Sequence, residues 1–241
     1  MRIIRVEHGG TSYYGILEDG LVFRLHQQPG HMEPIPLSEA KVLPLVTPSK
    51  VVCVGLNYKA HAEELGYPLP NMPSFFLKPP SSIIGNGEPI VLPSGMGRIE
   101  HEAELAMVVG KVCRNLTPEE AEESLFGFTC ANDVTAREVQ KVDPLIGHCK
   151  SYDTFCPIGP WIETELEDIN DLSIRCLVNG EVRQSANTGD MIFRPLDLLC
   201  FLSRVMTLMP GDVILTGTPP GISPIQADDV VQVSIEGIGT L

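Results

Sequence analysis

The sequence lacks several features that would assign it to a familiar class of protein. No apolar stretch approaches the ~18 residues of a membrane span. Residues 1–5 lead directly into polar residues, without the apolar core of a secretory signal. Seven cysteines are scattered along the chain and none forms a CxxC pair, so neither a zinc ribbon nor a thioredoxin-like site is supported. We therefore expect reduced cysteines, no membrane partner and a cytoplasmic location.

Positive charge is also scarce. The 241 residues include 17 Lys and Arg against 31 Asp and Glu, which gives a formal net charge of −14. Such a surface repels nucleic acid and anionic membranes, so we set both aside as partners. It makes a divalent cation an unsurprising companion, and a small anionic substrate would need a local positive site.

Common catalytic motifs are missing as well. The sequence has no GxSxG nucleophile elbow, no GxGxxG after the first strand and no phosphate-binding P-loop. His101 and Glu102 could begin an HExxH zinc motif, but Leu105 stands where the second histidine would be. These absences narrow the field, and they exclude a zinc protease.

The sequence does contain many short segments of strand character. With 21 Pro and 22 Gly, it suits short strands joined by turns better than a helical bundle. The Asn179-Gly180 pair predicts a hairpin turn. We predict a mainly β protein with a few helices. It divides into a small β-rich N-terminal unit at residues 1–45 and a main domain at residues 46–241.

Three helices are expected in the main domain. One covers residues 58–65, with Asn57 as N-cap and Gly66 as the residue that ends it, and another covers residues 195–208. The third begins at Pro118, where Thr117 and Glu120 have the spacing of a capping box. Residues 147–155 look irregular.

Residues 99–110 are the most informative stretch. Read as a strand with a period of two, they place Glu100, Glu102 and Glu104 on one face and apolar residues on the other. A solvated face would explain this row, whereas carboxylates that face a cavity would need a cation. Asp133 follows another apolar strand and adds a further carboxylate. Because oxygen ligands without His or Cys favour hard cations, we predict a site for Mg²⁺ or Mn²⁺, which Ca²⁺ could fill in a crystal.

A second candidate is the pair formed by His61 and Glu64. Their spacing of three places both on one face of the short helix at residues 58–65. In isolation such a pair is more typical of an exposed surface. The helix directly follows the apolar strand at residues 51–55, however, and strand ends often carry functional residues.

Seven blocks of the sequence are distinctive together. They are Val54–His61, Phe76–Ser82, Glu100–Leu105, Asn132–Arg137, Lys150–Phe155, Gly189–Phe193 and Gly211–Pro219. Through these blocks the chain resembles the fumarylacetoacetate hydrolase family over residues 45–241, and their occurrence in family order is far more specific than any one of them. The resemblance implies a mixed β-roll, like the C-terminal domain of that family, and commonly a homodimer.

The resemblance also implies roles for individual residues. The positions that match the family's metal ligands are Glu102, Glu104 and Asp133. His61 and Glu64 match a catalytic His-x-x-Glu pair, and Lys150 matches a catalytic lysine. Gln140 and Thr218 match substrate-binding positions.

Two departures from the family pattern affect the substrate pocket. Leu56 stands where many relatives carry Arg, which removes one possible contact with a substrate carboxylate. Residues 145–149 lack the Thr-Arg-Ala run that is frequent there. His148 could substitute, but a surface or structural histidine is the better interpretation.

The predicted function is hydrolysis of the C–C bond of an acylpyruvate, a 1,3-dioxo derivative of a 2-oxo acid. The reaction would pass through an enolate that the divalent metal stabilises. His61, oriented by Glu64, would deprotonate the attacking water, and Lys150 would hold an anionic oxygen.

Other reactions need the same electrostatic environment. The site could isomerise or tautomerise 2-hydroxyhepta-2,4-dienedioate or enol-oxaloacetate, or decarboxylate oxaloacetate. A non-catalytic metal-binding β protein is the alternative from a different class, although it gives no reason for His61, Lys150 and Thr218 to stand in family-like blocks.

Overall fold

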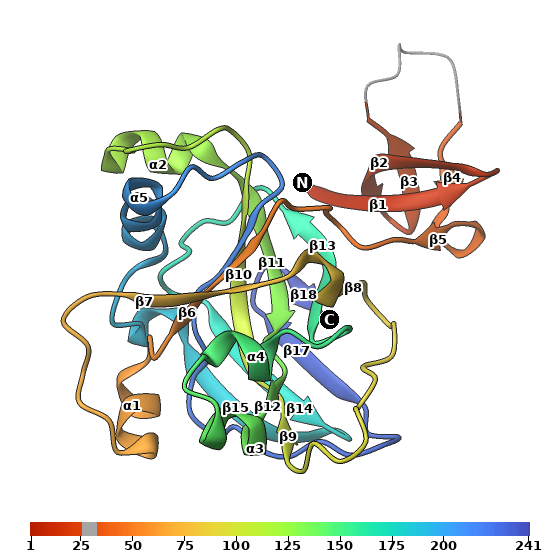
Figure 1. The fold of residues 1–241 in the computed structure, drawn as a ribbon. Helices are drawn as coiled ribbons and strands as arrows, with labels where there is room; N and C mark the ends of the chain where they lie inside the picture. The colour runs from red at the N-terminus through yellow and green to blue at the C-terminus, as the bar shows by residue number, and fades with distance from the viewer. Residues whose placement is uncertain (26–32) are drawn as a thin grey trace.

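The structure is a computed structural model that describes residues 1–25 and 33–241. Strands dominate the described chain, as predicted, and the helices are short (Figure 1). The strands are β1 (Arg2–His8), β2 (Thr11–Glu18), β3 (Leu21–Arg24), β4 (Ile35–Pro36), β5 (Lys41–Val42), β6 (Val51–Gly55), β7 (Ser74–Lys78), β8 (Ile83–Ile84), β9 (Ile99–Glu100), β10 (Ala103–Val109), β11 (Leu125–Asn132), β12 (Thr135–Ala136), β13 (Cys156–Glu163), β14 (Ser173–Val178), β15 (Glu181–Asn187), β16 (Val213–Leu215), β17 (Val231–Ile235) and β18 (Gly239–Thr240). The α-helices are α1 (Lys59–Leu65), α2 (Pro118–Ser124), α3 (Arg137–Val142), α4 (Ile146–Lys150) and α5 (Pro195–Val205), and 3₁₀ turns occur at Leu37–Glu39, Pro80–Ser82 and Thr188–Asp190.

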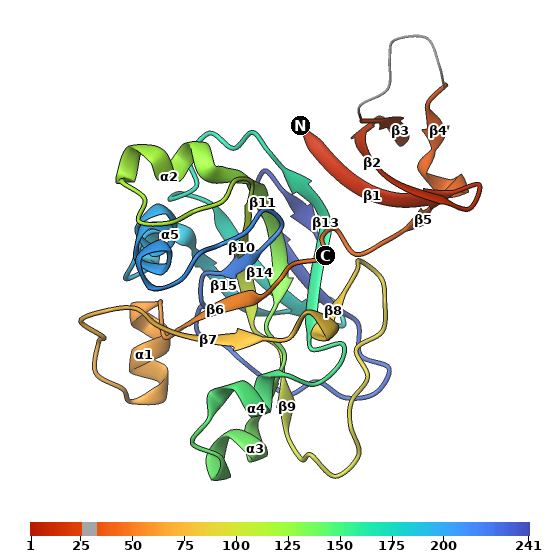
Figure 2. The ribbon, with the colours of Figure 1, turned by 45° about the horizontal axis from the view of Figure 1, so that its top comes forward.

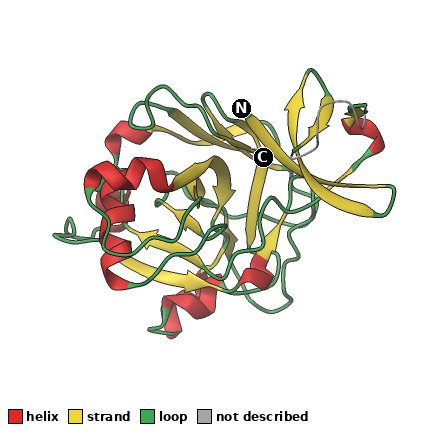
Figure 3. Ribbon diagram, turned by 90° about the horizontal axis from the view of Figure 1, so that it is seen from above, coloured by secondary structure: helices red, strands yellow, loops and turns green. Residues whose placement is uncertain are grey.

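One large sheet runs through the molecule. Its strand order is β4-β3-β2-β1-β13-β11-β10-β16-β6-β7, with β5 beside β1 and β8 beside β13. A four-stranded sheet, β15-β14-β17-β18, covers part of one face, and the largest apolar core lies between the two. The helices lie outside the strands (Figure 3). This arrangement is the mixed β-roll that the sequence predicts.

The N-terminal strands β1 to β5 project from the body (Figures 1 and 2), but they are not a separate sheet. β1 pairs antiparallel with β13 of the main domain, where Ile3 stands opposite Ile162. The predicted boundary at residue 45 therefore falls in a connection between two parts of one continuous sheet.

The central strands are apolar on both faces because both faces are covered. β6, with the sequence VVCVG, lies between the parallel strand β16 and the antiparallel strand β7, and its first four residues are buried. A strand with no solvated face reads as a continuous apolar run rather than an alternating one. The polar residues that such strands carry at their ends therefore stand out in the sequence.

Local turn and cap chemistry follows the prediction in three places. The β14–β15 hairpin turns at Asn179 and Gly180, which both have positive φ angles. Thr117 and Glu120 form the predicted capping box at the start of α2. Gly66 ends α1 in the left-handed conformation, at φ 70°.

Three expectations are wrong. The strand expected over residues 99–110 is broken between β9 and β10, because Asn132 Oδ1 and the amide of Asp133 bond the backbone of Glu102 in place of a ladder. Asn57 does not cap α1, because its side chain bonds the backbones of Phe193 and Thr216. The supposedly irregular segment at residues 147–155 begins with most of α4.

Candidate metal centre and active site

Three buried carboxylates gather where β10 and β11 meet. Glu102 precedes β10, Glu104 is on β10 and Asp133 follows β11. The antiparallel register pairs Ala103 with Asn132, so the flanking residues Glu102 and Asp133 are neighbours, and Asp133 N donates to Glu102 O at 2.8 Å. One oxygen of each carboxylate lies within 4.8 Å of the others. The structure thus brings together the residues that the sequence singles out, and their role as metal ligands stays a prediction.

Two buried lysines face this acidic triad. Lys150, at the end of α4, donates to Glu102 Oε2 and to Asp133 Oδ2, each at 2.6 Å. Lys78, at the end of β7, donates to the other oxygen of Asp133 and to Phe155 O. Burial alone would lower the pKa of Lys150, but Asp133 and Glu102 raise it above its ordinary value. Both ammonium groups therefore stay charged.

Lys78 is a residue of this centre to which sequence reasoning gave no role. The sequence does distinguish Lys78, since it is the one charged residue in the strand Ser74–Lys78 and stands directly before Pro79. Nothing in the local pattern identifies Asp133 as its partner.

Arg137 was likewise given no role, and it connects two glutamates. Its guanidinium donates to Glu102 Oε1 and, at 2.5 Å, to Glu100 Oε2. Arg98 bonds the other oxygen of Glu100. Glu100 therefore supports Arg137, and its charge is matched without a metal ion.

The pKa values of Glu102 and Glu104 are shifted in opposite directions. Burial favours the neutral acid of Glu102, but Lys150 and Arg137 overcome this effect and hold its pKa at about 2. Burial, followed by the charges of Asp133 and Glu102, raises the pKa of Glu104 well above its ordinary value of 4.5. Glu104 accepts a hydrogen bond from Gly217 N at 2.5 Å, and the described residues place no cation of the chain in hydrogen-bond contact with it.

This set of donors fits a divalent metal ion. A buried carboxylate beside two others and without a cationic partner is costly, and a hard cation bound to all three removes that cost. Oxygen donors from carboxylates are also those that Mg²⁺ and Mn²⁺ prefer. Glu102, Glu104 and Asp133 would hold the ion.

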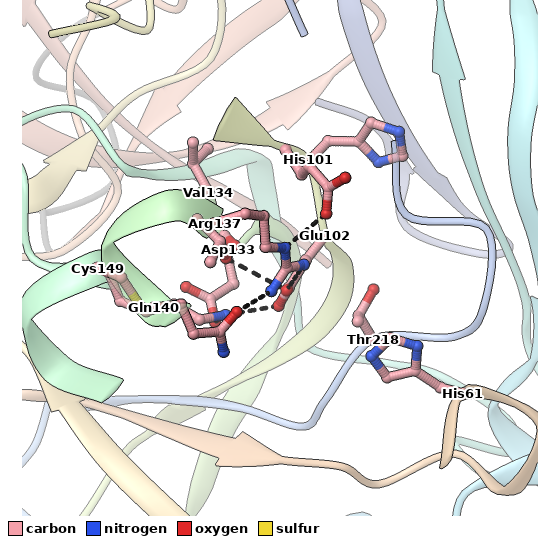
Figure 4. A network of polar contacts seen from close by, with 12 residues as sticks. His61, His101, Glu102, Asp133, Val134, Arg137, Gln140, Cys149 and Thr218 are labelled. Atoms are coloured by element: carbon pink, nitrogen blue, oxygen red, sulfur yellow. Dashed lines mark hydrogen bonds and ion pairs between the residues drawn. The ribbon is translucent and has the colours of Figure 1, made fainter. Parts of the chain in front are cut away.

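The predicted dyad is formed as well. His61, which is buried on α1, has its Nδ1 atom 2.8 Å from Glu64 Oε2. The other oxygen of Glu64 accepts from Gly221 N at 3.0 Å. A carboxylate on Nδ1 fixes the tautomer of a neutral imidazole and leaves Nε2 as the basic atom. Figure 4 shows His61 and Thr218 on one side of Glu102, and Asp133, Arg137 and Gln140 on the other.

The two predicted substrate-binding residues have different surroundings. Gln140 is half-buried on α3, and its Oε1 accepts from Arg137 Nη1 at 2.9 Å, which leaves the amide NH₂ as its donor group. Thr218 is buried, and its hydroxyl donates to Ala103 O at 3.0 Å. The hydroxyl hydrogen of Thr218 is thus used within the protein. His148 is exposed and bonds Asp143, as expected for a surface histidine.

Family comparisons agree with this architecture. Residues 50–241 match the family described as fumarylacetoacetate (FAA) hydrolase C-terminal, and residues 1–44 match one described as Rv2993c-like, N-terminal. The chain belongs to the fumarylacetoacetate hydrolase family. The members with named activities described below are enzymes, namely a tautomerase, an isomerase and a hydrolase.

Individual relatives cover most of the chain. The human mitochondrial oxaloacetate tautomerase FAHD2A is 42% identical over 221 residues, which are 86% of this chain and 70% of that protein. The structure of 5-carboxymethyl-2-hydroxymuconate delta-isomerase from Mycobacterium smegmatis superposes with a TM-score of 0.91 at 42% identity, and covers 100% of this chain and 96% of the other. Maleylpyruvate hydrolase from Sphingobium sp. SYK-6, in complex with manganese(II) and pyruvate, has a TM-score of 0.84 at 30% identity, with coverage of 100% and 97%.

No helix in the described part of the chain has the length and apolar character needed to cross a membrane.

Proposed function

We propose that this protein is a tautomerase or isomerase of a 2-oxo dicarboxylic acid, dependent on Mg²⁺ or Mn²⁺, that moves a proton at C3 beside the 2-oxo group. The charge of the centre carries this proposal. Lys78, Lys150 and Arg137 are paired with Glu102 and Asp133, whereas Glu104 has no cationic partner among the described residues. A divalent ion adds two positive charges, which suits a dianionic substrate. The relatives named tautomerase and isomerase, both 42% identical, support this reaction class.

A bound divalent ion supplies Lewis acidity, which stabilises negative charge on the 2-oxo oxygen. Lys150 has three N–H hydrogens, and Glu102 and Asp133 use two of them, so one is left for a substrate oxygen. Gln140 offers its NH₂ group on the same side as Arg137. Together these donors would orient the two carboxylates of the substrate.

His61 would move the proton. Glu64 holds Nδ1, so Nε2 can take a proton from C3 of the keto form or return it to the enol. Because His61 and the acidic triad come from different elements, proton transfer and charge stabilisation are supplied from two directions. The negative charge that develops on the 2-oxo oxygen can then be stabilised while the proton at C3 is transferred.

Hydrolysis of an acylpyruvate, the reaction predicted first from the sequence, remains the second candidate. The His61–Glu64 pair favours it, because a base of this kind can equally deprotonate water. The maleylpyruvate hydrolase structure holds manganese(II) and pyruvate, which supports the same metal and substrate class. Decarboxylation of oxaloacetate and metal binding without catalysis are the other outcomes of the test.

The test is an activity panel with Mg²⁺ or Mn²⁺. Decay of enol-oxaloacetate, monitored by ultraviolet absorbance, reports tautomerisation, and 2-hydroxyhepta-2,4-dienedioate reports isomerisation. Pyruvate release from acetylpyruvate or fumarylpyruvate reports hydrolysis, and pyruvate release from oxaloacetate reports decarboxylation. We expect the first pair of substrates to react fastest, and His61→Asn to slow them about 10²–10⁴-fold.

Either of two results would contradict the proposal. One is the absence of metal-dependent turnover of both isomerase substrates, and the other is full activity of Glu102→Gln without added metal. The matched control is Glu181→Gln, which removes an exposed carboxylate that pairs with Arg183 and does not belong to the triad. The homodimer and the domain boundary at residue 45 stay predictions, which light scattering and expression of residues 46–241 would test.

A further inference from the structure

Residues 216–221, here called the 216–221 loop, follow β16 and connect the two halves of the candidate site. At one end, Thr216 Oγ1 donates to Leu105 O at 2.8 Å, and Gly217 N donates to Glu104 Oε2. At the other end, Gly221 N donates to Glu64 Oε1. One short piece of backbone thus contacts both a residue of the acidic triad and the carboxylate that orients His61.

Gln184 holds the middle of this loop. It is on β15, 1% exposed, and its Nε2 donates to Thr218 Oγ1 at 2.8 Å and to Pro219 O at 2.7 Å. Its Oε1 accepts from Ala103 N at 3.0 Å. Ala103 lies between Glu102 and Glu104, so a single amide ties the loop to the strand of the acidic triad.

The orientation of this amide follows from its backbone partners. Pro219 O can only accept and Ala103 N can only donate, so the NH₂ group faces the loop and the oxygen faces β10. His101 Nδ1, 3.1 Å from the same oxygen, must then carry a hydrogen. A flipped amide would place its oxygen against Pro219 O and its NH₂ group against Ala103 N. Both hydrogen bonds would then be lost inside a buried network, which is costly.

The backbone of β15 also restricts the loop directly. Gly221 has φ 98°, and a Cβ atom at that position would overlap the carbonyl oxygen of Arg183. Gly217 has φ 97°, and a Cβ atom there would lie too close to the Cβ atom of Asn57. The two amides that bond the glutamates therefore belong to closely packed glycines, where a small displacement of the loop moves both donors.

We propose that Gln184 is a positioning residue, whose amide fixes the 216–221 loop so that one backbone segment orients both Glu104 and the Glu64–His61 dyad. Gln184 acts through the loop and itself contacts neither the acidic triad nor the dyad with its side chain. Its effect on catalysis rests on the proposed function, whereas its effect on the loop does not. Displacements of about 1 Å at a catalytic group can cost about 10²-fold in rate, so loss of this amide should be visible in kcat.

The test compares Gln184→Met with Gln232→Met in the full chain, by ¹⁵N NMR of the amides and by kinetics at saturating Mg²⁺. Gln232 lies in the same four-stranded sheet and is half-buried, but it bonds neither the loop nor β10. We expect the amide resonances of Gly217 and Gly221 to move together in Gln184→Met and to stay in place in Gln232→Met. We expect kcat to fall about 10–100-fold in the first variant alone.

A double-variant cycle separates positioning from a purely structural role. Combined with His61→Asn, Gln184→Met should lose less activity than the product of the two single losses, because the dyad is already disabled. If Gln184→Met does not fold, Gln184→Glu replaces it, since this side chain keeps the volume and the acceptor but lacks the donor to Pro219.

Two results would overturn the proposal. One is unmoved glycine amides, and the other is a kcat within twofold of the parent protein despite lowered stability. If the parent protein turns over none of the panel substrates, the proposed function fails. The NMR comparison still decides whether Gln184 fixes the loop.

Discussion

Lys78 and Asp133 form an ion pair that is almost completely buried, although 55 residues separate them along the chain. Lys78 reaches Asp133 from the end of β7, and Asp133 lies just beyond β11. Burial alone would lower the pKa of Lys78, but the adjacent Asp133 raises it, so the ammonium stays charged. The pair is thus needed for charge balance before any metal binds.

Replacement of Lys78 by Met should destabilise the metal-free protein. It would leave one oxygen of Asp133 without its cation, and breaking a buried pair in this way costs about 3–5 kcal/mol. We expect a loss near the lower limit, because Lys150 still bonds the other oxygen. Urea unfolding at pH 7 in EDTA measures it.

The matched control for this substitution is Lys141→Met, which removes an exposed pair with Glu138. Such surface pairs contribute about 0–1 kcal/mol. Equal stability losses in the two variants would show that the buried pair does not support the fold. A partial recovery of Lys78→Met on addition of Mg²⁺ would agree with a metal that binds Asp133.

Substitution of Glu104 by Gln should abolish stabilisation by metal. Saturating Mg²⁺, at 100 times its dissociation constant, adds about 2.7 kcal/mol to the free energy of unfolding of a protein that binds it only when folded. We expect this gain in the parent protein and in Glu181→Gln, but not in Glu104→Gln. Thermal unfolding with and without Mg²⁺ measures it, and an equal gain in all three proteins would remove Glu104 from the metal site.

The raised pKa of Glu104 gives this variant a pH signature. Because the pKa of Glu104 is higher in the folded than in the unfolded protein, Glu104 contributes most to the stability of the metal-free protein below pH 4.5. This contribution is lost as the pH rises through the folded-state pKa. The side chain that Glu104→Gln introduces is always neutral. In EDTA, the free energy of unfolding of this variant should therefore rise relative to that of the parent protein as the pH rises. Mg²⁺ binding to the parent should also release protons, which calorimetry in two buffers of different ionisation enthalpy detects. Binding without proton release would contradict a Glu104 pKa raised above its ordinary value.

Asp212 provides a pH test outside the candidate site. It is buried, and it accepts from Ser49 Oγ at 2.7 Å, from Lys50 Nζ at 2.5 Å and from the amide of Met209 at 2.8 Å. Burial would raise its pKa, but these bonds lower it below the ordinary 3.8. Its contribution to stability is therefore present above pH 3.8 and is lost as the pH falls further.

The variant Asp212→Asn should lose about 1.5–3 kcal/mol at pH 7, the range for hydrogen bonds to a charged group. The loss should shrink below pH 3.8, where the parent protein becomes protonated as well. Asp197→Asn, an exposed substitution in the first turn of α5, is the control. A loss for Asp212→Asn that is independent of pH would show that its charge has no role.

Much of this fold and site could be predicted from the amino-acid sequence. Turn and cap chemistry at Asn179, Gly180, Thr117 and Gly66 is local, because it depends on the φ preferences and hydrogen bonds of a few adjacent residues. Apolar runs gave the central strands, and the motif blocks gave the family. The resemblance carried by the same blocks pointed to Glu102, Glu104 and Asp133 as the carboxylates of one site.

The surroundings of those carboxylates, in contrast, depend on contacts between distant parts of the chain. The partnerships of Lys78, Arg137 and Gln184 join elements far apart in the chain, and strand pairing and burial, not neighbouring residues, bring them together. The break after β9 arose in the same way, because Asn132 from the adjacent strand binds the backbone of Glu102. A period of two describes one strand, whereas the charge balance of a buried site depends on every strand that reaches it.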